Sequence, residues 1–136
     1  MEQQEDVIAD ISPAREKFFG CSGKMLLPSP KTVAAFIQKM PARKLITTEL
    51  LRTKLAAQFN VQATCPVALR QALQAIANDA SHKVAYWRVV KKKGELISTY
   101  KGGLKTHATL LSKDSFAIDL AGKVPKVKDF AENRVI

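Results

Sequence analysis

Two amphipathic helical patterns, over residues 47–60 and 65–78, lie close together and constrain the fold more than any other feature of the sequence. The second pattern has an apolar face made of Leu69, Leu73 and Ile76. Its polar face consists of Arg70, Gln71, Gln74 and Asn78. Alanines between the two faces keep the helix surface low, so that another backbone can approach closely. Two helices joined by a short turn, the second with such a polar face, predict a helix-turn-helix, and a helical bundle with a solvated glutamine face is the alternative.

Hydroxyl and proline residues mark where the helices begin and end. Ser29 can cap a helix whose first residue is Pro30, and Pro41 stops this helix. Thr47 can cap the first helix of the close pair, and Asn60 is expected to end it. These signals predict three helices in the first two thirds of the chain.

The residues after the third helix predict the β-hairpin of a winged helix. Segments 84–90 and 96–100 are rich in β-branched and aromatic residues, which favour strands. A basic turn, Lys91-Lys92-Lys93-Gly94, connects them. A last helix is expected over residues 104–113. We therefore expect an α+β fold, namely a winged helix-turn-helix of three helices, a β-hairpin wing and a C-terminal helix.

Length and composition predict one compact domain with an addition at each end. The chain has 136 residues, of which 46% are hydrophobic, and this suits a single ordinary core. Residues 1–28 show scattered prolines and glycines without periodicity, so we expect an irregular leader there. Residues 29–115 would form the winged-helix domain, and residues 116–136 a short strand followed by a basic, extended and exposed tail.

Several classes of protein are excluded by what the sequence lacks. No apolar run approaches the roughly 20 residues that a membrane span needs. The acidic N-terminus has no apolar signal region, so we expect a cytoplasmic protein. Cys21, Cys65, His82 and His107 stand far apart, without the short spacing of metal ligands, so no metal and no cofactor are expected. A disulfide is disfavoured in a reducing compartment.

The net charge of +10 is the first indication of a partner. The segment 83–105 holds seven basic residues and one acid, Glu95. Such a cluster favours contacts with phosphates, because each contact releases condensed counterions. Basic composition is also common among ribosomal and membrane-surface proteins, so charge alone does not identify the partner.

Four short motifs follow one another between residues 86 and 115. They are Arg88-Val89-Val90, Gly94-Glu95-Leu96, Tyr100-Lys101-Gly102-Gly103-Leu104 and Leu110-Leu111. In this order they resemble the C-terminal domain of the methylated-DNA–protein cysteine methyltransferases. That family has a Pro-Cys-His-Arg-Val-Val motif, a glycine-containing turn, Tyr-x-Gly-Gly-Leu, and a Leu-Leu pair shortly before a glutamate. The resemblance spans residues 43–115 and is strongest over residues 86–111.

The family's reactive residues are replaced in this chain. Tyr86 stands at the position of the alkyl-accepting cysteine, and Trp87 at that of the activating histidine. Alkyl transfer needs a thiolate, and a phenol with an ordinary pKa of about 10 is a poor substitute. We therefore expect no alkyl transfer and no enzyme. Use of Cys65 or Cys21 by a divergent enzyme is the less favoured alternative, because Cys65 does not occupy the acceptor position.

The resemblance is nearer to the alkyltransferase-like proteins, which replace that cysteine with another residue. Proteins of this group bind damaged DNA and flip the altered nucleotide into a pocket without repairing it. The resemblance implies that Arg70 lies near the arginine that takes the place of the flipped base. It also implies a base pocket lined by Tyr86 and Trp87, together with Asp114, which falls near the family's glutamate. Thr48 falls near a tyrosine that contacts DNA.

Double-stranded DNA is therefore the expected partner, with a repair protein as a second one. The expected DNA contacts come from Arg70, Gln71, Gln74, Arg88, Lys91, Lys92 and Lys93. A winged-helix transcription regulator, or a protein-interaction module that shares the scaffold, is the alternative function.

Overall fold

The structure is a computed structural model. It describes residues 6–20, 22–40, 44–78, 84–98, 100, 102–114, 116–120 and 124–128. Within this part of the chain no helix is both long and apolar enough to cross a membrane.

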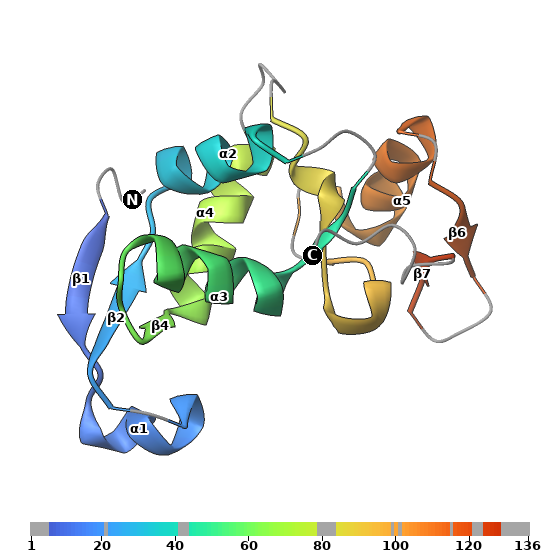
Figure 1. Ribbon diagram of the computed structural model, residues 1–136. Coiled ribbons are helices and arrows are strands. Elements are labelled where there is room, and N and C mark those ends of the chain that lie inside the picture. The colour runs from blue at the N-terminus through green and yellow to red at the C-terminus, as the bar shows by residue number, and fades with distance from the viewer. Residues whose placement is uncertain are drawn as a thin grey trace.

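Helices and short strands alternate along the chain (Figure 1). The helices are α1 (Pro13–Phe19), α2 (Pro30–Gln38), α3 (Thr48–Gln58), α4 (Pro66–Asn78) and α5 (Gly103–Lys113). Two single 3₁₀ turns are η1 (Tyr86–Arg88) and η2 (Lys92–Gly94). The strands are β1 (Val7–Asp10), β2 (Lys24–Leu27), β3 (Ile46–Thr47), β4 (Ala63–Thr64), β5 (Val89–Val90), β6 (Ile118–Asp119) and β7 (Lys126–Val127). The α+β class is confirmed.

The helix starts follow the capping signals in the sequence. The Ser29 hydroxyl accepts a hydrogen bond from the backbone N–H of Thr32 at 3.3 Å, and Pro30 is the first residue of α2. The Thr47 hydroxyl accepts from the N–H of Leu50 at 3.0 Å. Each cap satisfies a backbone donor that has no partner inside its helix. The predicted starts of α2 and α3 are thereby confirmed, and α4 runs from Pro66 to Asn78, as the pattern over residues 65–78 predicts.

The leader is not irregular where the structure describes it, so that prediction was wrong. β1 and β2 form an antiparallel pair, and β2 also pairs in parallel with β4. Pro13 is the first residue of α1, and Gly20, with φ 71°, is its C-cap. Residues that interrupt the periodicity are therefore helix boundaries. The partner of β2 lies far along the chain, which local periodicity cannot reveal.

The predicted β-hairpin wing is also absent from the described residues. Within 84–90 only β5 is extended, and it pairs in parallel with β3. The described residues of 96–100 form no strand, and the Leu96 N–H donates to the Pro125 carbonyl at 3.0 Å. Val89 and Val90 are both fully buried, whereas a wing strand would expose alternate residues. Burial on both faces explains why the β-branched run forms a short parallel pair.

The described residues of the tail, 116–120 and 124–128, fold back onto the domain, so the prediction of an extended and exposed tail was wrong for them. The expected short strand forms as β6, and β7 pairs with it in antiparallel fashion. Val127 of β7 is only 2% exposed. It packs in a core cluster with Leu45, Val90, Leu96, Leu111 and Phe116. The alternation of valine and lysine therefore reflects one buried and one solvated face.

Two hydrophobic clusters make up most of the core. The larger one lies among α2, α3 and α4, and the smaller one joins α5 to β6 and β7, at the opposite end of the molecule in Figure 1. Trp87 packs against both clusters. The segment around η1 is consequently where the two halves meet.

His107 holds this junction from within α5. Its side chain is fully buried, and Nδ1 accepts a hydrogen bond from the Ile97 N–H at 3.0 Å. Nε2 must therefore carry the proton, which it donates to the Trp87 carbonyl at 2.8 Å. The ring also packs edge-on against Tyr100, with 4.9 Å between ring centroids. A neutral imidazole thus ties α5 to the segments on both sides of the basic turn.

Burial lowers the pKa of His107, although its hydrogen bonds to the backbone of Trp87 and Ile97 act in the opposite direction. The unfolded chain therefore takes up a proton near pH 6.5 that the folded chain resists. This contribution to stability is complete above about pH 6.5 and is lost as the pH falls towards the lower folded-state pKa.

We predict that His107→Gln lowers the free energy of unfolding at pH 7.5 by about 1–3 kcal/mol, because a buried backbone group loses its partner. The same change should flatten the loss of stability between about pH 7 and pH 5.5. Urea denaturation at several pH values measures both effects. His82→Gln, which removes the other histidine, is the control and should keep the wild-type slope. An unchanged slope in His107→Gln would contradict the assignment.

Candidate nucleic-acid interface

A cavity of about 250 Å³ lies where the starts of α3 and α4 approach the segment 91–100. Its apolar lining consists of Pro66, Leu69, Leu73, Ile97 and Tyr100. Its polar lining consists of Thr48, Arg52, Arg70 and Lys91. The leucines, the isoleucine and the tyrosine are buried, whereas Arg70 and Lys91 are exposed. The cavity therefore has an apolar floor and a basic rim.

Two of the predicted DNA-binding residues meet at this rim. Arg70 projects from the first turns of α4, and Lys91 directly follows β5. They come from segments about twenty residues apart in sequence, and the parallel pairing of β5 with β3 helps to hold Lys91 in place. Positive charge at the mouth of a cleft attracts phosphate groups.

The other predicted DNA-binding residues do not line the cavity. Gln71 is exposed and Gln74 is half-buried, both on α4. Lys93 is exposed, with φ 68°, in the tight turn that η2 forms. Only the backbone of Lys92 is described, so the prediction for its side chain lies outside the described residues.

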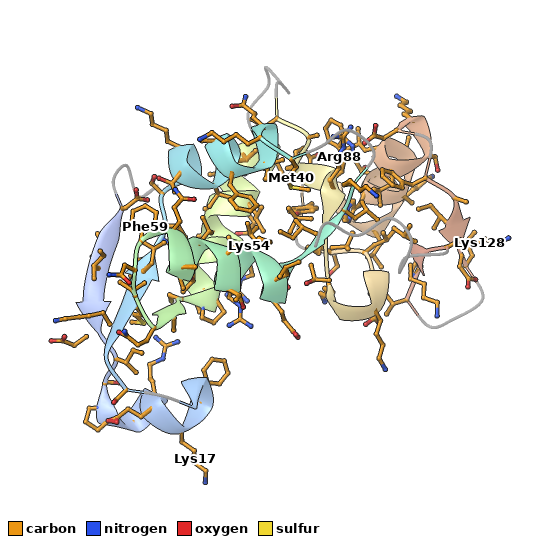
Figure 2. All side chains as sticks on the ribbon, in the orientation of Figure 1. Lys17, Met40, Lys54, Phe59, Arg88 and Lys128 are labelled. Carbon is orange, nitrogen blue, oxygen red and sulfur yellow. The ribbon has the colours of Figure 1, made fainter. Side chains whose placement is uncertain are left out.

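Arg88 is engaged in an ion pair inside the protein. Its Nε and Nη2 donate to the two carboxylate oxygens of Asp114 at 2.6 and 2.9 Å. The two side chains are only 16% and 19% exposed. Arg88 lies on η1, between α4 and α5 (Figure 2). While this bidentate pair is intact, the Arg88 guanidinium joins η1 to the C-terminal end of α5 and does not face a phosphate.

Trp87 shares the same carboxylate. Its indole Nε1 donates to Asp114 Oδ2 at 3.1 Å. Trp87 and Asp114 stand where the resemblance places a histidine and near where it places a glutamate, and here a hydrogen bond joins them. Since neither side chain lines the cavity, their predicted place in a base pocket receives no support from this geometry.

Tyr86 is a core residue in this structure. It is 2% exposed and makes edge-on ring contacts with Tyr100, at 5.0 Å, and with Trp87, at 5.4 Å. Burial raises the pKa of Tyr86, so the phenol stays neutral at physiological pH. A neutral, buried hydroxyl is not a nucleophile. Tyr86 does not line the cavity, and its predicted place in a base pocket is likewise unsupported.

Tyr100 lines the cavity, whereas the sequence predicted that Tyr86 would line it. Its hydroxyl lies 3.2 Å from the Tyr86 carbonyl and 3.3 Å from the Val89 carbonyl, and it donates to this pair of acceptors. Burial, together with the nearby Tyr86, raises the pKa of Tyr100 well above its usual value. The ring is therefore fixed and neutral. The signal for it was its place in the Tyr-x-Gly-Gly-Leu motif.

Arg52 lines the cavity, whereas Cys65 does not. Arg52 lines the cavity from α3, although the helical pattern alone points it away from the apolar face. Cys65 is 5% exposed and packs with Ile11, Met25 and Ala68, away from the cavity. Cys21 lies outside the described residues. The described thiol therefore has little access to a substrate.

We predict that Asp114→Asn lowers the free energy of unfolding by about 1–3 kcal/mol, because it leaves the shielded Arg88 guanidinium without a counter-charge. Adding Arg88→Gln should recover part of this loss. Urea denaturation of both single variants and the double variant measures the coupling. The control is Asp10→Asn at the exposed Lys24–Asp10 pair, which should change stability by less than about 1 kcal/mol. Equal losses at the two sites would contradict the prediction.

Comparisons with known proteins bear on the fold. By sequence, no protein-family model and no curated protein matches the chain. Among solved structures, it is similar to the S. pombe alkyltransferase-like protein (ATL), whose crystal structure contains DNA. The TM-score is 0.58 at 16% sequence identity, and the match covers 79% of this chain and 94% of that chain. The chain therefore has the α+β fold of an alkyltransferase-like protein, which the sequence motifs had led us to expect.

Proposed function

We propose that this chain is a non-catalytic DNA-binding protein of the alkyltransferase-like type, which holds a modified base without repairing it. The observation that carries the proposal is the likeness in fold to a protein whose crystal structure contains DNA. The basic rim of the cavity, at Arg70 and Lys91, is the surface of this chain best suited to the same partner.

The electrostatics of this rim support duplex binding. The chain has a net charge of +10, and exposed cations lie beside the start of α4 and in the turn that follows β5. Exposed lysines and arginines neutralise phosphates and release counterions, so the affinity should fall steeply with salt. The alanines of α4 do not add to this surface, because Ala68, Ala72 and Ala77 are buried in the core.

The residue at the position of the family's acceptor cysteine supports the proposal that the chain does not transfer alkyl groups. Tyr86 fills it with a buried phenol whose pKa is raised, and no thiol among the described residues lines the cavity. This arrangement can bind an altered base, but the described residues place no thiol at the cavity to accept its alkyl chain.

The cavity supports the capture of an extruded base. Its floor of leucine, isoleucine and tyrosine side chains is apolar, as a flat aromatic base requires. Arg70 stands at its edge, where it could enter the base stack when a nucleotide leaves it. A sequence-selective transcription regulator would need no such cavity. The titration below distinguishes this alternative from the recognition of a modified base.

Titration of matched duplexes, with and without an alkyl group on the exocyclic oxygen of one guanine, tests the proposal. We expect tighter binding of the modified duplex at both low and moderate salt, with no label transferred from alkylated DNA to protein. Equal affinity for both duplexes would remove the recognition of damage. Selectivity for one unmodified sequence would favour a transcription regulator instead.

We predict that Arg70→Ala weakens binding to the modified duplex about tenfold or more and reduces base extrusion, followed with a fluorescent base analogue. The side chain is exposed, so the free energy of unfolding should change by less than about 0.5 kcal/mol. The control is Lys54→Ala, which removes one positive charge from α3 at a residue that does not line the cavity. Unchanged extrusion in Arg70→Ala would show that Arg70 has another role.

A further inference from the structure

The cavity holds more positive charge than its surroundings compensate. Arg52, Arg70 and Lys91 all line it, and none of them forms an ion pair with a described acid. Arg52 also lines a second groove, between α3 and β4, together with Glu49, an acid one turn earlier on α3. Glu49 makes no ion pair with Arg52. Three cations therefore share one small space without a described counter-charge.

Among the described residues, the half-buried Arg88 is paired with Asp114 through two hydrogen bonds. Arg52 is also only half-exposed, yet it forms no ion pair with a described carboxylate. Unpaired cations that lie close together repel one another, and the repulsion grows when water is excluded.

Binding of DNA over the mouth of the cavity would exclude water in this way. Arg70 and Lys91 are exposed on the rim, where they can reach backbone phosphates. Arg52 also lines the cavity, from α3, and is less exposed than the two rim cations, so a charged group brought in by the ligand could compensate it. The first residues of α3 and α4, Thr48 and Pro66, also line the cavity, and the positive ends of their helix dipoles add to the same field.

We propose that the base adduct preferred by this cavity carries a negative charge. The chemical class is a guanine whose exocyclic oxygen bears a short alkyl chain that ends in a carboxylate. Leu69, Leu73 and Ile97 would contact the methylene groups, and the Arg52 guanidinium would bind the carboxylate through charge-assisted hydrogen bonds. This inference rests on the proposed function, because it concerns the same cavity and the same extruded base.

Three duplexes that differ at one guanine isolate the charge of the adduct. The first is unmodified, the second carries a carboxymethyl group on the exocyclic oxygen, and the third carries the carbamoylmethyl group, which is its neutral amide of nearly equal size. We expect the full chain to bind the carboxymethyl duplex about tenfold more tightly than the amide, as one charge-assisted contact provides.

Variants then assign the preference to Arg52. Arg52→Gln should reduce the ratio between carboxymethyl and amide duplexes to about threefold or less, whereas Arg52→Lys, which keeps the charge, should retain more of it. Lys54→Gln is the matched control, because Lys54 is a cation of the same helix, labelled in Figure 2, and it does not line the cavity. Urea denaturation of each variant separates loss of folding from loss of recognition.

The outcomes distinguish this inference from the function on which it rests. Equal binding of the two modified duplexes, both tighter than the unmodified one, would overturn the charge preference and leave the recognition of damage standing. Equal binding of all three would remove both. A preference for the carboxylate that survives in Arg52→Gln would overturn the assignment to Arg52.

Discussion

The structure depends on the pair of hydrogen bonds made by a neutral, buried His107. One bond fixes the Ile97 N–H and the other fixes the Trp87 carbonyl, so α5 is joined to both ends of the segment that carries the basic turn. Ile97 lines the cavity, and Trp87 packs against both hydrophobic clusters. The shape of the cavity and the union of the two halves of the core thus rest on a single imidazole in one tautomer.

The positions that resemble a reactive site in the methyltransferases have a structural role here. Trp87 and Arg88 both donate to Asp114, and Tyr86 packs on Tyr100. The cavity lies next to this group and takes its charge from Arg52, Arg70 and Lys91.

Local signals in the sequence predicted helices α2 to α5 well, but they missed α1 and predicted the strands poorly. Ser29 and Thr47 cap helices through contacts a few residues away, which a sequence displays directly. The strands β2 and β5 find their partners in β4 and β3, far along the chain, and at two to four residues they are too short for a periodic pattern. The predicted wing failed for this reason.

The candidate site divides in the same way between local and long-range signals. Arg70 was predicted from its place on the polar face of one helix, and it does lie at the cavity. Arg52 was missed, because the helical pattern of α3 identifies its buried face but not the loop that approaches the opposite side. Arg88 pairs with Asp114 at the C-terminal end of α5, and Tyr86 packs on Tyr100. The alternation along residues 84–90 could not reveal either contact.

The shielding of the Arg88–Asp114 pair has a consequence for handling the protein. Salt screens contacts between exposed charges over a Debye length of about 10 Å at 0.1 M, but it acts much less on a pair that is largely enclosed. The exposed cations at the cavity rim and this ion pair should therefore respond differently to ionic strength. A high-salt wash would strip bound polyanions during purification and leave the junction between α5 and η1 closed, so that the protein is recovered folded and empty.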